Sequence, residues 1–412
     1  MIPSRVAALQ ALNTFVQTGK TGTAYAADRN SDHGPNKHRA VSVLSAYVRH
    51  RLLTETEVLA AVLAKEGSSR AEKFIQEVCW RTYWKGWLEN RPQVWMQYQQ
   101  QRDNHRALNP AVVKAIAKAK ASHTGIECFD AWTRELVETG YLHNHARMWY
   151  ASIWIFTLNL PWAQGADWFM QNLLDADAAS NTLSWRWVAG LQTQGKHYLA
   201  RADNIARYTG GRFDPRGQLN EDAAPLEESI AAMATHSSSP KLTSYKAPRL
   251  SGDEILLIHE DDCSVETLAQ IQSISGMVVV QTTAARSPNA INTLCQTFTQ
   301  TALLDASNRA AAHWQLKPEQ IVQINAASDL FNCFQTHPAL MGKPVVHTWL
   351  PVGPTRDALA PILQRLSTAQ VAVKPILRDW DLAAWPHATR GFFQFKTKIP
   401  SLLQDQFSPD LF

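Results

Sequence analysis

Residues 140–190 read GYLHNHARMWYASIWIFTLNLPWAQGADWFMQNLLDADAASNTLSWRWVAG. Six tryptophans lie in this stretch, and the apolar, helix-compatible sequence around them is interrupted by charged and amide side chains. Buried charges are rare unless they are paired, and a buried indole N–H needs a hydrogen-bond partner. The stretch therefore indicates a cavity that binds a large, polar, aromatic ligand rather than an ordinary core. The interrupting side chains include Arg147, Asp175, Asp177 and Asn181.

The chain as a whole has the composition of a globular protein with an excess of tryptophan. It has 412 residues, of which 45% are apolar and 18% are charged, and a formal net charge of +4. Chains of this length contain roughly two to three domains. Fifteen tryptophans exceed what a core requires, which indicates stacking on a ligand or on nucleobases. The small positive charge permits a polyanionic partner without requiring one.

The cysteines and the N-terminus bear on the cellular compartment. No CxxC pair is present, and no histidine lies near a cysteine at metal-ligand spacing, so we expect reduced, structural cysteines and no bound metal. The first residues, MIPSRVAALQALNTFV, lack the pattern of a signal peptide, and no apolar run approaches the length of a membrane span. The sequence therefore predicts a cytoplasmic protein without a membrane segment. The cysteines are Cys79, Cys128, Cys263, Cys295 and Cys333.

The first part of the chain, residues 1–217, follows a helical pattern. Apolar side chains recur every three positions over residues 3–15, which predicts a helix that keeps them near one face. Thr54 and Glu57 have the spacing of a capping box and predict the start of another helix. The apolar positions of the first helix are Val6, Leu9, Leu12 and Phe15. Further long helices are expected over residues 71–88 and 130–160.

The amino-acid composition changes at residues 218–253, which are acidic and then rich in Ser, Pro and Ala. This segment predicts a linker, with a short helix expected around residues 226–233. Beyond it, short β-rich runs alternate with segments long enough for helices, which predicts a parallel sheet with crossover helices. The fold class is therefore α plus α/β, with a Rossmann-like α/β domain and a C-terminal segment over residues 254–412. The expected strands are 255–259, 277–281, 321–324 and 345–348.

Four motifs, in one order along residues 5–217, connect the helical domain with a known family. Together they resemble the flavin-binding helical domain of the DNA photolyase and cryptochrome family. The resemblance covers over half of the chain and implies that this domain binds FAD. The motifs are Tyr25 followed by SVLSAY at 42–47, EVCWR at 77–81, HNHARM at 143–148, and DADAASN at 175–181 followed by WRW at 185–187.

The first motif is similar to the family segment TSxLSPYL, which holds the diphosphate of the flavin cofactor. Hydroxyls and backbone amides at a helix start suit anionic oxygens, although serines at such positions serve more often as helix caps. Ala46 stands where the family has Pro, and Arg51 where a Gly is usual. The cluster at residues 49–51, Arg-His-Arg, could contact phosphate or DNA, or could form a solvated face. The resemblance assigns cofactor contacts to Tyr25, Ser42, Val43, Leu44 and Ser45.

The second motif looks like the family's ELxWR. The resemblance implies that Glu77 hydrogen-bonds a damaged pyrimidine and that Trp80 stacks beside it. Residues three apart on a helix share one face, so this carboxylate and this indole can line one pocket. An exposed Glu next to a core Trp would give the same sequence. Thr82 stands where an acidic residue usually follows the Arg of this motif.

The third motif resembles HNRxRM. The resemblance implies that Asn144 and Met148 face the lesion and that Arg147 lies under the flavin. His145 replaces an Arg that commonly touches a DNA phosphate, and a mostly neutral His weakens that contact. The family branch that repairs the other major ultraviolet photoproduct usually has His at the positions of Asn144 and Met148, so the motif favours the cyclobutane dimer.

The fourth motif resembles DGDxAxNxxxWQW. The resemblance implies an ion pair between Arg147 and Asp175 beside the isoalloxazine ring, with Asp177 on the polar edge of the cofactor. Asn181 is expected opposite the flavin N5, where a neutral amide tunes the redox chemistry of the ring. Trp187 is expected to stack on the lesion together with Trp80.

Two tryptophans match the electron-donating chain of the family. Trp185 and Trp162 occupy its first two positions, along which an electron passes to the photoexcited flavin. The outermost tryptophan is missing, since residues 106–107 are Arg-Ala. Each of these indoles could instead serve packing alone. Trp149, Trp154 and Trp132 are possible substitutes for the missing one.

The α/β domain resembles the antenna domain of the family more weakly. GFFQFK at residues 391–396 is similar to the F-x-x-F-[KR] segment that ends this domain in relatives, where the domain precedes the flavin domain. Here it follows, which indicates a circular permutation. HEDDCS at residues 259–264 follows the first strand in place of a Gly-rich phosphate loop, so no nucleotide site is expected there. No motif requires an antenna chromophore, and whether one binds stays open.

The resemblance implies an FAD-dependent enzyme that repairs cyclobutane pyrimidine dimers in light. Damaged DNA is the expected partner, with the dimer flipped into the cavity, and a monomer is expected. The main alternative is a cryptochrome-like blue-light photoreceptor without repair activity. A third is a flavoprotein that has lost repair, which the permuted order, His145 and Thr82 mildly favour. Retention of Glu77, Trp80, Asn144, Met148 and Trp187 together favours repair.

Overall fold

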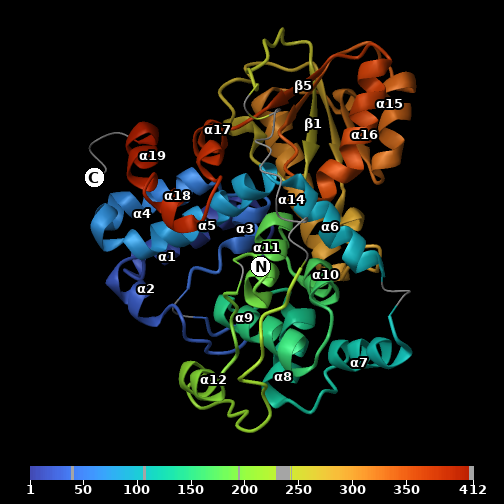
Figure 1. The fold of residues 1–412 in the computed structure, drawn as a ribbon. Helices are drawn as coiled ribbons and strands as arrows, with labels where there is room; N and C mark the ends of the chain where they lie inside the picture. The colour runs from blue at the N-terminus through green and yellow to red at the C-terminus, as the bar shows by residue number, and fades with distance from the viewer. Residues whose placement is uncertain (39–40, 105–107, 194, 229–241, 243, 408–412) are drawn as a thin grey trace.

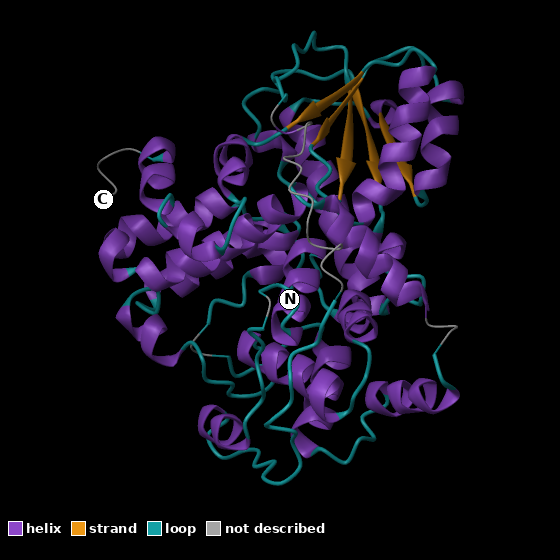
Figure 2. Ribbon diagram, viewed as in Figure 1, coloured by secondary structure: helices purple, strands orange, loops and turns teal. Residues whose placement is uncertain are grey.

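The computed structural model describes residues 1–412 except 39–40, 105–107, 194, 229–241, 243 and 408–412. Helices make up the first part of the chain (Figures 1 and 2). They are α1 (Arg5–Gln17), α2 (Thr23–Asp28), α3 (Ser45–Arg49), α4 (Glu55–Arg70), α5 (Glu72–Glu89), α6 (Pro92–Asp103), α7 (Pro110–Lys120), α8 (Glu127–Thr139), α9 (Asn144–Ser152), the π-helix η2 (Ile153–Thr157), α10 (Trp162–Asn172), α11 (Ala178–Ala189) and α12 (Ala202–Tyr208).

A parallel sheet and its helices make up the second part, so the α plus α/β class is confirmed. The strands are β1 (Ile255–His259), β2 (Gly276–Val280), β3 (Ile321–Ile324), β4 (Val345–Thr348) and β5 (Val373–Ile376). The α-helices are α14 (Thr293–His313), α15 (Leu330–Thr336), α16 (Pro354–Thr368), α17 (Asp379–Ala384), α18 (Phe392–Lys396) and α19 (Ile399–Gln406). Short 3-10 turns include η5 (Thr283–Arg286) and η8 (Trp385–His387).

The capping box that opens α4 is confirmed, but the apolar face predicted for α1 is partly wrong. Thr54 accepts a hydrogen bond from the backbone N–H of Glu57, whose carboxylate accepts one from the backbone N–H of Thr54. In α1, Val6 and Leu9 are 62% and 41% exposed. Positions three apart in a helix drift by roughly 60° per step, so four of them do not share one face. The buried residues of α1 are Ala8, Leu12, Phe15 and Val16.

The single helix predicted over residues 130–160 is wrong. α8 ends at Thr139, Gly140 adopts a left-handed conformation with φ of 68°, and α9 starts only at Asn144. A Cβ atom at position 140 would lie 2.6 Å from Cγ of Leu174. Both the positive φ and this close contact require glycine, so the chain breaks there despite its apolar pattern. The helix expected around residues 226–233 extends into residues outside those described.

The sheet has the strand order β3-β2-β1-β4-β5, and all neighbours are parallel. Its two faces belong to different cores, because side chains alternate along each strand. Leu256 and Ile258 of β1 join the core shared with α14 and the helical part, whereas Ile255 and Leu257 join the core under α15 and α16. Strands β1, β3 and β4 match the prediction, and β2 begins and ends one residue earlier than predicted. The sequence VKPI of β5 lacks an apolar pattern and was missed.

The C-terminal segment returns to the helical part of the chain. α17, η8 and α18 pack on α5, and Figure 1 shows α18 beside it. The ring of Phe392 stacks on Trp80 with centroids 3.6 Å apart and planes 10° apart. A Cβ atom at Gly86 of α5 would lie 2.8 Å from Cα of Trp385, so the two segments meet at backbone distance. The second part of the chain therefore contacts α5 along several of its turns.

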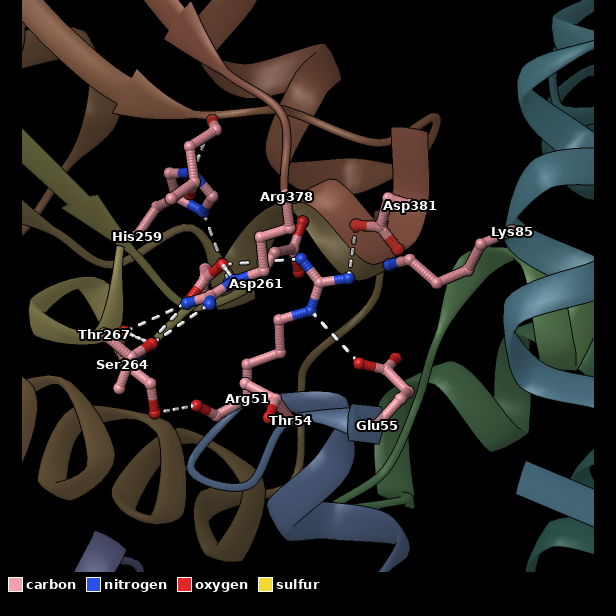
Figure 3. A network of polar contacts seen from close by, with 12 residues as sticks. Arg51, Thr54, Glu55, Lys85, His259, Asp261, Ser264, Thr267, Arg378 and Asp381 are labelled. Atoms are coloured by element: carbon pink, nitrogen blue, oxygen red, sulfur yellow. Dashed lines mark hydrogen bonds and ion pairs between the residues drawn. The ribbon is translucent and has the colours of Figure 1, made fainter. Parts of the chain in front are cut away.

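Buried ion pairs join the two parts of the chain at the carboxyl end of β1. Arg51 lies 2.5 Å from Asp381 and 3.5 Å from Glu55, and Figure 3 draws both contacts. Arg49 lies 2.6 Å from Asp261, and Arg49, His50 and Arg51 are all buried. The cluster at residues 49–51 is therefore neither a solvated face nor a DNA contact, because it packs against the second part of the chain.

We predict an acid-sensitive contribution to stability from Asp262. Burial alone would raise the pKa of this carboxyl, but Arg378 and Arg51 lower it to about 2. A depressed pKa stabilises the fold above pH of about 4, and that contribution is lost as the pH falls toward 2. Between these two pH values, the free energy of unfolding of the parent, measured with urea, should therefore fall by roughly 2 kcal/mol more than that of Asp262→Asn. Parallel pH dependences of the two proteins would contradict the assignment.

The cysteines and the membrane prediction can be compared with the described residues. All five cysteines are free thiols, as predicted, and four of them are buried. Within the described ranges, no helix combines the length and the apolar character that crossing a bilayer requires.

Candidate functional site

A cavity with two lobes lies between α5, α9, α11 and the segment that leads into α3. The larger lobe has a volume of about 600 Å³ and the smaller one of about 290 Å³. They are continuous, since they share much of their lining, and their size suits a large cofactor. The residues that line both lobes are Glu77, Trp80, Trp84, Asn144, Arg147, Met148, Asp175, Ser180 and Ser184.

Fifteen of the sixteen site residues predicted from the sequence line this cavity; Trp162 is the exception. Those expected at the cofactor diphosphate, which are Tyr25, Ser42, Val43, Leu44 and Ser45, line the larger lobe. Val43 has a φ of 53°, a strained conformation for a β-branched residue, and such strain is typical of ligand sites. Asp177, Asn181, Trp185 and Trp187 line the smaller lobe.

Arg147 and Asp175 form the predicted ion pair across the junction of the two lobes. Nη2 of Arg147 donates to Oδ2 of Asp175 at 2.8 Å, and its Nε donates to the carbonyl of Leu142 at 2.9 Å. Oδ1 of Asp175 is buried and has no partner within the chain, and the same holds for the indole N–H of Trp185. Unpaired buried polar atoms are costly, and both residues line the smaller lobe, so a polar ligand in this lobe suits them.

Asp177 is held at the start of α11 by the helix and by cations. Its Oδ1 accepts a hydrogen bond of 2.8 Å from the N–H of Ser180, and Oδ2 lies 3.4 Å from Arg81 and 3.6 Å from Lys85. Burial opposes ionisation of this carboxyl, but Arg81 and Lys85 outweigh it and hold its pKa well below the usual range. Asp177 is therefore a fixed negative charge in the wall of the smaller lobe.

Asn181 presents one defined atom to the cavity. Its amide N–H donates to the carbonyl of Ala166 at 2.8 Å. This leaves the amide oxygen, an acceptor, for a ligand in the smaller lobe. Such an oxygen suits a ring N–H, which is the contact expected at the flavin N5.

The second, third and fourth motifs of this domain lie in a segment that matches a family model. Residues 74–247 match the model described as the FAD binding domain of DNA photolyase. This part of the chain is similar to the FAD-binding domain of the photolyase and cryptochrome family. A deoxyribodipyrimidine photo-lyase of Streptomyces griseus is 30% identical over 211 residues, which are 51% of this chain and 45% of that protein. Cryptochrome-2 of Arabidopsis thaliana is 30% identical over 203 residues, 45% of this chain and 32% of that one.

The likeness to these relatives is partial. The chain spans about half or less of the length of the curated photolyases and cryptochromes it matches. A cryptochrome structure from Synechocystis sp. PCC6803 covers 50% of this chain and 43% of its own, with 22% identity and a TM-score of 0.43. The matched relatives include both photolyases and cryptochromes, so the similarity supports an FAD site without choosing between the activities of the two groups.

The residues that the family resemblance assigns to a lesion surround the cavity. Glu77 lies 3.5 Å from Arg29, and 37% of its side chain is exposed. Partial burial raises the pKa of this carboxyl, against the opposing effect of Arg29. Trp187 stacks on Tyr198 with ring centroids 5.9 Å apart. Trp80 stacks on Phe392 with ring centroids 3.6 Å apart. Each indole is therefore braced on one side.

The tryptophans of the family's electron chain are only partly in contact. Trp185 packs against Phe169, with ring centroids 5.1 Å apart, and against Trp154 at 6.3 Å. Gly165 permits this packing, since a Cβ there would lie 2.3 Å from Trp185. Among the described aromatic contacts, Trp162 meets Tyr98 at 5.8 Å rather than Trp185.

The outermost electron donor stays a prediction. Residues 106–107, where the family places it, lie outside the described residues. Of the three possible substitutes, Trp154 contacts Trp185, while Trp149 and Trp132 stack on each other with centroids 5.5 Å apart. Trp154 therefore lies beside Trp185, which the resemblance assigns to the first position of the electron-donating chain.

Three residues of α5 were missed as parts of the site. Trp84 lines both lobes, and Arg81 and Lys85 pair with Asp177. The signal was present, because Glu77, Trp80, Arg81 and Trp84 follow the spacing of one helix face. Their partner Asp177 lies almost a hundred positions away, which a helical pattern does not reveal.

His145 does not supply the charge of the family's arginine. Its ring is within hydrogen-bond distance of the carbonyl of Asn30 (3.1 Å) and the hydroxyl of Tyr198 (3.2 Å), and it stacks on Trp149. Burial lowers the pKa of His145, so this side chain is neutral at pH 7. The weakened phosphate contact at this position stays a prediction.

Proposed function

We propose that the cavity binds FAD and that the protein repairs cyclobutane pyrimidine dimers in DNA with light. The observation that carries the proposal is that one continuous cavity brings together the residues expected at a lesion and those expected at the cofactor. The first set is Glu77, Trp80, Asn144, Met148 and Trp187. The second set includes Arg147, Asp175, Asp177 and Asn181.

Four side chains would hold the ring system of the cofactor. The ion pair of Arg147 and Asp175 lies where the two lobes join, with one carboxylate oxygen unpartnered. Asp177 supplies a fixed negative charge, and the oxygen of Asn181 accepts a hydrogen bond. Bound FAD supplies light-driven one-electron chemistry.

The lesion side of the cavity suits a flipped pyrimidine dimer. A dimer stacks poorly in the duplex, which lowers the cost of moving it into a pocket. Trp80 and Trp187 offer flat faces for stacking. Glu77, with its raised pKa, can donate a hydrogen bond as a neutral acid or accept one as a carboxylate.

A photoreceptor that does not repair DNA is the second candidate. One observation favours it: Phe392 covers one face of Trp80 at 3.6 Å, so only the other face is open to a ligand. A receptor would use the same cofactor site and would not need the lesion residues.

The proposal predicts that Glu77→Ala lowers repair without loss of FAD. A hydrogen bond to a charged group contributes about 1.5–3 kcal/mol, so repair efficiency or dimer affinity should fall about 10- to 100-fold. Trp80→Ala should weaken dimer binding through lost stacking, by about 1–3 kcal/mol. Repair of a dimer-containing oligonucleotide is measured under blue light, and FAD content by absorbance.

Glu72→Ala is the matched control, since Glu72 lies on the same helix and pairs with Lys396 outside the cavity. It should repair like the parent. If Glu77→Ala and Trp80→Ala also bind and repair like the parent, the cavity is not a lesion site, and the photoreceptor becomes the better reading.

A further inference from the structure

The strand order places β1, the central strand of the sheet, beside β4, with crossovers running to opposite edges. In open parallel sheets, ligands bind in the crevice at the carboxyl ends of such strands. Here that crevice faces the helical part of the chain and contains arginines of this chain. Arg286 pairs with Glu260 at 3.0 Å, Arg49 with Asp261 at 2.6 Å, and Arg378 with Asp262 at 2.6 Å.

One small cavity lies in this crevice among the described residues. A cavity of about 10 Å³ is lined there by Arg49, Asp177, Asp261 and the loop over residues 351–354, among others. That volume holds about one water molecule. A Cβ atom at Gly353 of this loop would lie 2.8 Å from Cβ of Ala178, so the loop touches the first residue of α11. This cavity is therefore smaller than an antenna chromophore.

Arg49 joins this crevice to the cofactor cavity. Its Nη1 donates to Oδ1 of Asp261 at 2.6 Å and to the carbonyl of Glu260 at 3.0 Å. Its Nε donates to the carbonyl of Ala176 at 2.8 Å. The side chain is only 4% exposed, so these contacts are not screened by solvent. One guanidinium therefore binds the end of β1 and the peptide between Asp175 and Asp177.

That peptide determines where both carboxylates of the cofactor site point. Asp175 faces Arg147, and Asp177 caps α11, on either side of Ala176. A rotation of the Ala176 carbonyl would move the backbone of both neighbours. Burial opposes ionisation of Asp261, but Arg49 and Lys85 outweigh it and hold its pKa below the usual range, so the anchor of Arg49 stays charged.

We propose that Arg49 is a positioning residue for the cofactor: the end of β1 holds its guanidinium, and Arg49 holds residues 175–177 in the conformation that binds FAD. The α/β domain thus acts as a clamp on the cofactor site. The inference rests on the proposed binding of FAD by the cavity.

The test compares Asp261→Asn with Asp262→Asn. Both variants remove one carboxylate from the same loop, but of the two only Asp261 pairs with Arg49. FAD is titrated into apoprotein, the visible circular dichroism of bound FAD is recorded, and the unfolding midpoint of each apoprotein is measured. We expect Asp261→Asn to raise the dissociation constant for FAD about 10-fold and to change the flavin dichroism. Asp262→Asn should lower the midpoint but leave both flavin readouts unchanged.

Arg49→Lys is the second variant, since an ammonium does not reproduce the geometry of a guanidinium that bridges two sites. It should weaken FAD binding at least as much as Asp261→Asn. Unchanged FAD affinity and dichroism in Asp261→Asn and Arg49→Lys would overturn this inference and leave the proposed function intact. An equal loss of FAD affinity in Asp262→Asn would do the same. A parent protein that binds no FAD would overturn the proposed function and, with it, this inference.

Discussion

Replacing Trp185 by phenylalanine is expected to reduce the photoreduction of bound, oxidised FAD at least 10-fold while leaving FAD content unchanged. Trp185 lines the cavity and is 2% exposed, and the family resemblance assigns it the first position of the electron-donating chain. Phenylalanine keeps most of the packing against Phe169 and Trp154, and such a swap costs on the order of 1 kcal/mol. Repair from chemically reduced FAD should persist, because no electron from Trp185 is then needed.

Transient absorption after a blue flash measures the yield of flavin radical directly. Trp385→Phe is the matched control, because Trp385 is 1% exposed and its N–H also lacks a partner, but it lies in η8 and does not line the cavity. The control should keep the radical yield of the parent. An undiminished yield in Trp185→Phe would exclude Trp185 as the proximal donor.

Removing the charge of Arg147 is expected to destabilise the protein and to release FAD. Arg147→Ala leaves the carboxylate of Asp175, which is 6% exposed, without its partner at 2.8 Å. Breaking a buried pair costs about 3–5 kcal/mol, and the 23% exposure of Arg147 favours the lower end of that range. Urea unfolding of the apoprotein and the FAD content of the purified variant are the two measurements.

A double variant distinguishes the loss of the ion pair from an unspecific loss of stability. Arg147→Ala combined with Asp175→Asn removes both charges, so part of the lost stability should return, with a coupling of about 1–3 kcal/mol. If Arg147→Ala retains full stability and FAD content, or if the two changes are simply additive, the pairing does not hold the site together.

The sequence predicted the composition of the site better than its surroundings. Fifteen of sixteen predicted residues line one cavity because the ordered motifs carry their own local geometry: Glu77 and Trp80 share one face of a helix, and Asp177 caps the helix that holds Asn181. Trp84 lies one turn beyond Trp80 and follows from the same spacing. It was missed because an indole in a helix is equally consistent with core packing.

What the sequence did not predict depends on contacts between distant segments. Gly140 breaks a helix because Leu174 crowds it, and Val6 is exposed because a three-residue repeat drifts around the helix. Arg49 and Arg51 are buried because the end of β1 supplies their carboxylates from more than two hundred residues away. No local pattern distinguishes such arginines from solvated ones. The boundaries of the domains and the roles of the site residues stay predictions.

The central claim is that the cavity combines a cofactor site with a lesion site. Its most direct test is the absorption spectrum of the purified parent protein, followed by blue-light treatment of a dimer-containing oligonucleotide with the reduced protein. We predict a flavin spectrum at about one FAD per chain and light-dependent loss of the dimers, with none in the dark. A flavin spectrum without any repair would contradict the lesion site and favour a photoreceptor, and the absence of bound flavin would contradict the account as a whole.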